Sequence, residues 1–216
     1  MTAQFVASCT ILGGTNGSGK STIYEDAMRP QIEGEFVNAD ILARRISPNA
    51  PESASLRAGR QVVARLRDLI AAPQSFVHET TLSSRQSLQV MKQARDAGYQ
   101  IGLIFVMLHS VELNVLRVQE RVRMGGHSIP EKDIRRRYDR ALANLPEAIK
   151  IAHQVAVYDN SSISHIKLIE ISNGNIVFKA LVETNPAHYQ IADAVGSALD
   201  IAPDMVFKVA RPTSRS

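Results

Sequence analysis

The chain has 216 residues, and its 25 Lys and Arg residues against 21 Asp and Glu residues give it a formal net charge of +4. With 44% hydrophobic and 21% charged residues and no apolar run long enough to span a membrane, it has a globular composition, which excludes a mainly disordered chain. The single cysteine, Cys9, excludes a disulfide framework and a cysteine zinc cluster, and together with the lack of a secretory signal it favours a cytoplasmic protein.

Apolar runs and turn residues divide the chain into alternating strands and helices. The segments expected to be strands are residues 5–12, 35–38, 74–78, 100–108, 155–158, 165–172 and 176–182. Those expected to be helices are residues 20–28, 41–46, 53–71, 83–97, 111–124, 130–152 and 187–199. This alternation predicts a single α/β domain over residues 1–216, with three layers and a mostly parallel sheet. The turn Asn173-Gly174-Asn175 predicts a C-terminal antiparallel hairpin, and residues 211–216 are expected to be a frayed tail.

The loop after the first predicted strand carries a phosphate-binding motif. Gly14-Thr15-Asn16-Gly17-Ser18-Gly19-Lys20-Ser21 fits the pattern G-x-x-x-x-G-K-[ST] in full and is followed by Thr22. Its glycines let backbone N–H groups surround a phosphate, and the helix that follows directs its positive end at the same anion. We expect Lys20 to reach the β- and γ-phosphates of ATP, and the Ser21 hydroxyl to ligate Mg²⁺.

Other motifs narrow the class of phosphate-loop protein. The sequence has neither the N-K-x-D motif of GTPases nor the L-S-G-G-Q signature of transporter ATPases, and no clear Walker B strand. A small-molecule kinase fits within the length of the chain. We therefore predict a P-loop fold of the nucleoside-kinase type.

Asp40 is the predicted catalytic base. It follows the second predicted strand, at the sheet edge where ligands gather in open α/β folds. A carboxylate there can orient and deprotonate a substrate hydroxyl for attack on the γ-phosphate. The alternatives are a water-mediated contact with Mg²⁺ and an N-terminal cap for the helix that begins at Ile41.

The third predicted strand delivers Glu79, Thr80 and Thr81 to the same edge. Glu79 is expected to bind the metal through water or to hydrogen-bond substrate hydroxyls. The two threonines either contact a phosphate or cap the next helix. His78 alternates to the opposite face of the strand, and no role is assigned to it.

The positive charge is concentrated in residues 117–140. Its eight basic residues against four acids account for a charge of +4, and they are Arg117, Arg121, Arg123, Lys132, Arg135, Arg136, Arg137 and Arg140. A helix, the Gly125-Gly126 break and a second helix describe a lid, and its arginines would stabilise charge on the transferred phosphate. His127 at the break either contacts phosphate or makes a hinge hydrogen bond. A solvated helix face is the plainer interpretation of the same charges.

The ordered set of motifs resembles the zeta-toxin family, most of all its short bacterial branch, over residues 5–160. The motifs are residues 14–22, Asn38-Ala39-Asp40, residues 76–81, the arginines and glycines of residues 117–127, Ile134-Arg135-Arg136-Arg137-Tyr138 and Tyr158-Asp159-Asn160. The resemblance implies ATP-dependent phosphorylation of the 3′-hydroxyl of a UDP-activated amino sugar such as UDP-N-acetylglucosamine. It also implies a toxin that a separate small helical antitoxin holds inactive.

The resemblance also implies roles for individual residues. Asp40 would be the base, Glu79 and Thr80 would line the sugar site, and Arg121 would bind the transferred phosphate together with a second lid arginine. Family members place that second arginine before a Thr-Pro pair, where this chain has His127-Ser128-Ile129-Pro130, so Arg136 or Arg123 would substitute for it.

Two other readings of the sequence stay open. One is a kinase of another acceptor, such as a nucleoside, an antibiotic or a sugar acid. The other is a nucleotide-dependent nucleic-acid-binding module, which the low aromatic content of 5% disfavours.

Overall fold

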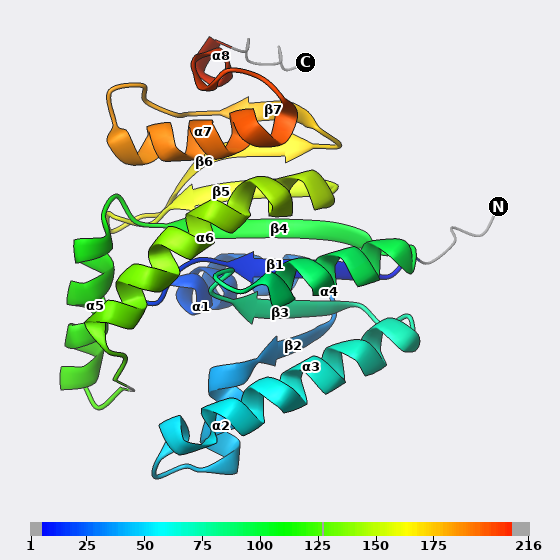
Figure 1. Ribbon diagram of the computed structural model, residues 1–216, viewed down its shortest axis with the longest axis vertical. Helices are drawn as coiled ribbons and strands as arrows, with labels where there is room; N and C mark the ends of the chain where they lie inside the picture. The colour runs from blue at the N-terminus through cyan, green and yellow to red at the C-terminus, as the bar shows by residue number, and fades with distance from the viewer. Residues whose placement is uncertain (1–5, 127, 209–216) are drawn as a thin grey trace.

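A seven-stranded sheet forms the centre of the molecule. The structure, a computed structural model, describes residues 6–126 and 128–208, and within them the strand order is β2-β3-β1-β4-β5-β6-β7 (Figure 1). The strands are β1 (Ser8–Gly13), β2 (Glu35–Asn38), β3 (Phe76–Thr80), β4 (Gln100–Met107), β5 (Gln154–Asp159), β6 (Ile166–Ser172) and β7 (Asn175–Lys179). Strands β1 to β5 pair in parallel, whereas β6 and β7 add an antiparallel hairpin. The predicted fold class is therefore confirmed.

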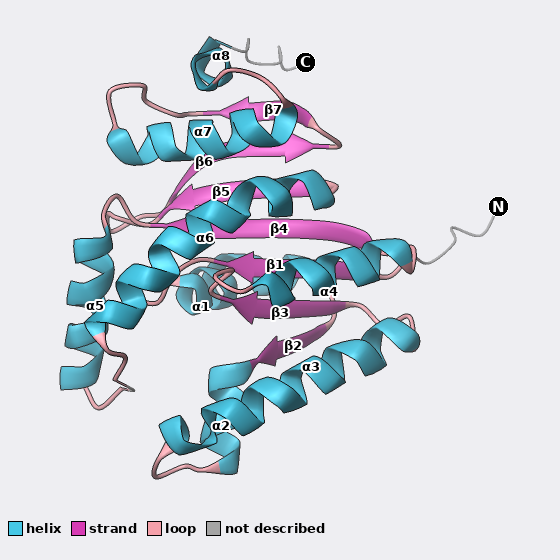
Figure 2. Cartoon of the chain, in the orientation of Figure 1, coloured by secondary structure: helices cyan, strands magenta, loops and turns pink. Residues whose placement is uncertain are grey.

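Helices cover the two faces of the sheet unequally. The helices are α1 (Lys20–Ile23), α2 (Ala39–Ile46), α3 (Ser55–Ala71), α4 (Arg85–Asp96), α5 (Val111–Arg123), α6 (Glu131–Ile151), α7 (Pro186–Leu199) and α8 (Pro203–Lys208). Helices α3, α4, α6 and α7 lie on one face, and α1 lies on the other (Figure 2). None of the described helices is both long and apolar enough to cross a lipid bilayer.

Successive residues of β1 pack into two hydrophobic clusters, a larger one and a smaller one, on opposite faces of the sheet. Ile11 faces the larger cluster, where it joins Leu66 of α3 and Leu145 of α6, whereas Leu12 faces the smaller cluster with Ile23 and its neighbours. Both strand residues are fully buried, as period-two alternation requires of a central strand that is covered on each side.

Several predicted boundaries shift. The helix expected to stop before Pro30 instead continues as a π-helical turn, η1 (Tyr24–Met28), and a 3₁₀ turn, η2 (Arg29–Gln31). Pro30 is tolerated because it occupies the first turn of η2, where its missing N–H has no helical partner. The strand expected over residues 74–78 lies at 76–80, and α8 was not predicted. Residues 211–216 lie outside the described residues.

Helix α3 offers a matched test of this core. Leu66 is 1% exposed and Leu56, on the same helix, is 71% exposed. Leu66→Ala should lower the free energy of unfolding by about 2–5 kcal/mol because it leaves a cavity, and Leu56→Ala should change it by less than about 0.5 kcal/mol. Urea denaturation measures both, and equal effects would contradict this placement of α3.

Candidate active site

The carboxyl ends of the parallel strands meet at one edge of the sheet and bring the predicted site residues together. The loop after β1 lies there, with the ends of β2 and β3 beside it. Asn38 and Glu79 are register partners on β2 and β3, and Leu12 of β1 pairs with Glu79 on the other side. Chain crossovers thus place segments that are far apart in sequence next to one another, as open α/β sheets do at their ligand sites.

The phosphate loop, residues 14–21, is held from outside by the side chain of Asn114. Gly17 has φ +79°, and a Cβ there would lie 2.6 Å from the carbonyl oxygen of Asn114. Asn114, fully buried on α5, donates from Nδ2 to the carbonyl of Asn16 at 2.8 Å and to the hydroxyl of Thr15 at 3.2 Å. The buried Ser18 hydroxyl has no hydrogen-bond partner among the described residues. Such an orphaned polar atom fits a loop that is completed by an anion.

Lys20 places a buried cation at the start of α1. Its side chain is 8% exposed, and its ammonium donates to the carbonyl of Thr15 at 3.1 Å and lies 4.0 Å from Glu79. Burial lowers the pKa of Lys20. Glu79 and Asp40 act in the opposite direction, and Arg121 and Arg137 add to the lowering. Two carboxylates and two guanidinium groups therefore lie within electrostatic reach of one ammonium.

Ser21, Glu79 and Asn38 form a polar cluster suited to a hydrated cation. The Ser21 hydroxyl donates to the Glu79 carboxylate at 3.1 Å, and Asn38 Nδ2 donates to the same carboxylate at 2.8 Å. Hydroxyl and carboxylate oxygens are the donors that Mg²⁺ prefers, and it usually keeps several waters. The residues present thus fit a magnesium ion, which Ser21 would ligate and whose water Glu79 would hold.

Asp40 lies in the first turn of α2 with an exposed side chain. The cap of this helix is Asn38, whose side chain accepts from the N–H of Ile41 at 2.9 Å. The capping alternative for Asp40 is therefore wrong. Asn38 takes that place, and the Asp40 carboxylate stays within electrostatic reach of Lys20.

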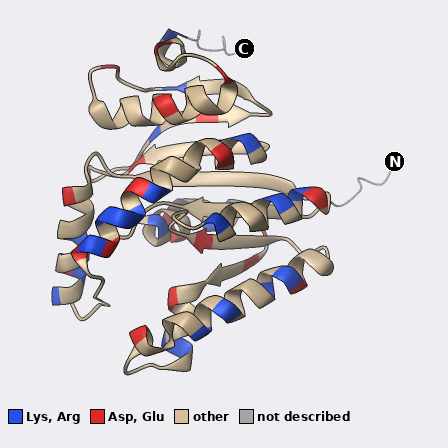
Figure 3. Ribbon diagram, in the orientation of Figure 1, with Lys and Arg blue, Asp and Glu red and all other residues tan. Residues whose placement is uncertain are grey.

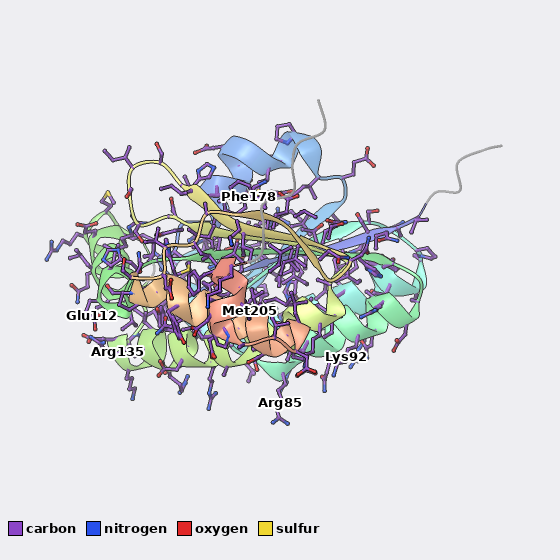
Figure 4. The ribbon with its side chains drawn as sticks, turned by 90° about the horizontal axis from the view of Figure 1, so that it is seen from above. Arg85, Lys92, Glu112, Arg135, Phe178 and Met205 are labelled. Atoms are coloured by element: carbon purple, nitrogen blue, oxygen red, sulfur yellow. The ribbon has the colours of Figure 1, made fainter. Side chains whose placement is uncertain are left out.

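Four of the lid arginines divide into two groups. On α6, Arg135 pairs with Glu131 and with Glu112 of α5, the latter at 2.9 Å (Figure 4), and Arg136 pairs with Asp133 at 2.8 Å. These pairs are largely exposed and correspond to the solvated face considered above. Figure 3 shows several Lys and Arg residues along the N-terminal half of α6.

The second group faces the phosphate loop. Arg137 Nη1 donates to the side-chain oxygen of Asn16 at 2.9 Å. Arg121 and Arg137 both lower the pKa of Lys20, because their positive charges repel its ammonium. Ile134, Tyr138 and Ala141 are the buried positions in the first half of α6, so Arg137 borders its inner face and Arg136 points away from it. The structure therefore brings Arg137, and not the expected Arg136, to the loop.

The remaining predicted substrate residues lie in different surroundings. The Thr80 hydroxyl contacts the Ser87 hydroxyl at 2.9 Å and accepts from the N–H of Leu82 at 3.2 Å, so it organises the turn before α4. The Thr81 hydroxyl contacts that of Ser83 at 2.7 Å. Arg123 is exposed at the end of α5 and lines a small cavity beside α6. His127 lies outside the described residues.

A cavity of about 630 Å³ opens beside the polar cluster, at the free edge of β2. Asn38 and Ile41 line it next to Asp40, and Phe36, stacked on Tyr24 with ring centroids 4.6 Å apart, forms an aromatic wall. Its volume is in the range of small-molecule sites, and its lining combines this aromatic wall with charged side chains, among them Arg45 and Arg65.

Two residues at the loop were assigned no role from sequence, Asn114 and Asn160. Asn160 follows β5 and donates from Nδ2 to the carbonyl of Ser18 at 2.9 Å. Asn114 shares the buried face of α5 with Val115 and Val118, and a polar residue within that apolar pattern was the available signal. The Tyr158-Asp159-Asn160 motif marks the position in the sequence, but the motif alone does not indicate a contact with Ser18.

Comparison with known proteins identifies relatives of this chain. The AAA_33 model, described as an AAA domain, matches residues 10–144. An uncharacterised protein of Haemophilus influenzae is 36% identical over 128 residues, which cover 58% of this chain and 88% of that protein.

Solved structures share the fold at low sequence identity. The AvrRxo1-ORF1:-ORF2 complex with ATP superposes with a TM-score of 0.65 at 14% identity, over 91% of this chain and 66% of that one. The PezAT toxin-antitoxin system of Streptococcus pneumoniae gives a TM-score of 0.56 at 15% identity, over 93% and 89%. The Pnkp1/Rnl/Hen1 RNA repair complex gives 0.52 at 25% identity, over 66% and 46%. The chain thus has a P-loop kinase-like fold, which implies nucleotide binding.

Gly19 and Gly174 provide a test of the cradle because both have left-handed backbones, with φ +85° and +78°. A Cβ at Gly19 would lie 2.2 Å from Asn160 Nδ2, whereas one at Gly174 meets nothing within 4 Å. Gly174→Ala should cost about 1 kcal/mol in unfolding free energy through strain alone. Gly19→Ala should cost about 1 kcal/mol more, because Asn160 must leave the Ser18 carbonyl. Urea denaturation measures the free energy of unfolding of both variants. Equal losses would contradict the contact between Asn160 and the loop at Gly19.

Proposed function

The chain belongs to the AAA_33 family of AAA domains, and we propose that it is an ATP-dependent kinase of a small molecule that carries a hydroxyl group. The observation that carries the proposal is the set of groups around Lys20. Glu79 lies 4.0 Å from its ammonium, Arg137 donates to Asn16 of the phosphate loop at 2.9 Å, and the charges of Asp40 and Arg121 also act on Lys20. A base, a metal-binding carboxylate and two cations at one phosphate site are the parts that phosphoryl transfer requires.

The phosphate loop binds the triphosphate in this proposal. Its N–H groups and the positive end of α1 surround the β-phosphate, and Lys20 extends between the β- and γ-phosphates. Mg²⁺, when bound, supplies a positive charge that neutralises the phosphate oxygens. Ser21 would ligate it directly, and Glu79, oriented by Asn38, would hold its water.

Asp40 acts as the general base. It accepts the proton of the acceptor hydroxyl as the hydroxyl oxygen bonds to the γ-phosphorus, and the bond from that phosphorus to the β–γ bridging oxygen breaks, releasing ADP. Arg121 and Arg137 donate to the γ-phosphate oxygens, where negative charge is held during transfer. Arg137 would leave Asn16 to do so, because both contacts use the same guanidinium group.

The acceptor is proposed to enter through the cavity beside β2, because this cavity borders both Asn38 and the helix that carries Asp40. The motifs support an amino sugar attached to UDP, with UDP-N-acetylglucosamine as the first candidate. A nucleoside, an antibiotic or a sugar acid is the alternative. The likeness in fold to a toxin-antitoxin system supports a toxin with a separate antitoxin chain as its partner.

Asp40→Asn tests the base directly. The full chain is incubated with labelled ATP, Mg²⁺ and each candidate acceptor, and phosphorylated product is measured by mass spectrometry. Asp40→Asn should lower the transfer rate by about 10²–10⁴-fold while ADP affinity is retained. Asp68→Asn, an exposed change on α3, should have no effect. Transfer that survives in Asp40→Asn would remove Asp40 as the base, and no transfer by the wild type to any acceptor would contradict the proposed function.

Arg137 and Arg136 give a matched pair on α6. Arg137→Ala should lower the transfer rate by about 100-fold, because one cation is lost from the charge that develops on the γ-phosphate. Arg136→Ala removes only an exposed ion pair with Asp133 and should change the rate by less than about threefold. The rate at saturating ATP is the measurement, and the opposite ranking would restore Arg136 to the site.

A further inference from the structure

The turn that begins at the last residue of β5, residues 159–161, contacts the phosphate loop although it lies beyond the residues 10–144 that the family model matches. Asn160 Nδ2 donates to the carbonyl of Ser18 at 2.9 Å, and the Asn160 backbone N–H donates to the carbonyl of Met107 at 3.0 Å. The fit against Gly19 is tight, because a Cβ on that glycine would lie 2.2 Å from Asn160 Nδ2. Asn160 therefore holds one particular peptide unit of the loop.

The orientation of that peptide unit matters for anion binding. The Ser18 carbonyl and the Gly19 N–H belong to one planar trans peptide and point in opposite directions. When Asn160 holds the carbonyl on the outside, the Gly19 N–H is directed towards the inside of the loop. An inward N–H group is what the loop offers to a phosphate.

The other residues of the turn fix Asn160 in place. One oxygen of the Asp159 carboxylate accepts from the backbone N–H of Ser161 at 2.8 Å and also from its hydroxyl. The Ser161 hydroxyl accepts from the N–H of His109 at 2.8 Å, and its carbonyl accepts from Arg117 at 3.3 Å. The turn is thus anchored to the end of β4 and to α5.

His188 connects this turn to α7. Its Nδ1 accepts from the N–H of Val182 at 3.0 Å, so in the neutral ring the proton resides on Nε2. Nε2 lies 3.6 Å from the second oxygen of Asp159, and the two side chains are only 9% and 14% exposed. This separation is too long for a hydrogen bond, so the buried His188 ring packs beside the Asp159 carboxylate, and Ser161 supplies the hydrogen bonds to the other oxygen.

We propose that the C-terminal part of the chain positions the phosphate loop through a clamp made of Asn160, Asp159 and His188. Asn160 sets the Ser18–Gly19 peptide for phosphate binding, and Asp159 and His188 hold Asn160. All three are positioning residues, since the loop stands between them and the nucleotide. The inference rests on the proposed function only in taking a nucleotide as the ligand of the loop.

ADP affinity tests the clamp without any acceptor. The full-length chain is titrated with fluorescently labelled ADP and with labelled adenosine, and thermal unfolding is recorded for each variant. Asn160→Ala should weaken ADP binding by about tenfold and leave adenosine binding unchanged, because the clamp acts on the phosphate site alone. Asn160→Asp keeps the side-chain size but loses the donor and adds negative charge, so it should weaken ADP further. Asn175→Ala, on the exposed hairpin, is the matched control.

The contribution of His188 is measured by a double-mutant cycle. His188→Leu should weaken ADP binding by about threefold, and the double variant His188→Leu/Asn160→Ala should be no weaker than Asn160→Ala, because both act through one turn. Multiplicative effects would remove His188 from the clamp. Equal ADP affinity in the wild type, Asn160→Ala and Asn160→Asp would overturn the proposal, as would an equal loss for adenosine or a wild type that does not bind ADP. Tight ADP binding without transfer to any acceptor would instead contradict only the kinase function.

Discussion

The buried ammonium of Lys20 is the feature on which the arrangement of the site depends. A cation with an 8% exposed side chain is costly to keep charged unless partners compensate for its lost hydration. The carbonyl of Thr15 and the Glu79 carboxylate compensate in part, and burial still lowers the pKa of the group. A phosphate that enters the loop would supply the missing negative charge at the position where the ammonium lacks it. The loop is therefore preorganised for an anion, and its unliganded form bears the electrostatic cost.

The order of the strands in the sheet brings residues from distant parts of the sequence to the Lys20 ammonium. Glu79 reaches Ser21 and Asn38 because β3 lies between β1 and β2, so its carboxyl end is flanked by the phosphate loop and by the start of α2. One carboxylate thereby joins the metal-binding hydroxyl, the ammonium and the cap of α2. A change in register by one residue would turn Glu79 to the opposite face and remove all three contacts together.

The sequence predicts most of the fold and the identity of the loop, because both rest on local patterns. The alternation of strands and helices specified the sheet class, and the glycine-lysine motif specified the anion site. The choice between Arg136 and Arg137 could have been made from the buried positions 134, 138 and 141 of α6, since Arg137 borders that face. The roles of Asn114 and Asn160 could not be predicted in this way, because their partners are distant in the sequence. Asn114 contacts a loop residue 98 positions away, and Asn160 contacts one 142 positions away. The change of α1 into a π-helical turn also left no local signal that we can identify.

The arginines that give the chain its net charge of +4 differ in what they contact. Arg135 and Arg136 pair with neighbouring acids at the surface, where salt screens them and they contribute little to stability. Arg121 and Arg137 instead lie where they oppose the charge of Lys20. Glu79 and Asp40 offset part of this repulsion, and a bound triphosphate would offset more of it. Its stabilisation of the folded chain then rises with the logarithm of its concentration above the dissociation constant. On this account the cations around the loop, which the two carboxylates offset only in part, are the source of its response to nucleotide.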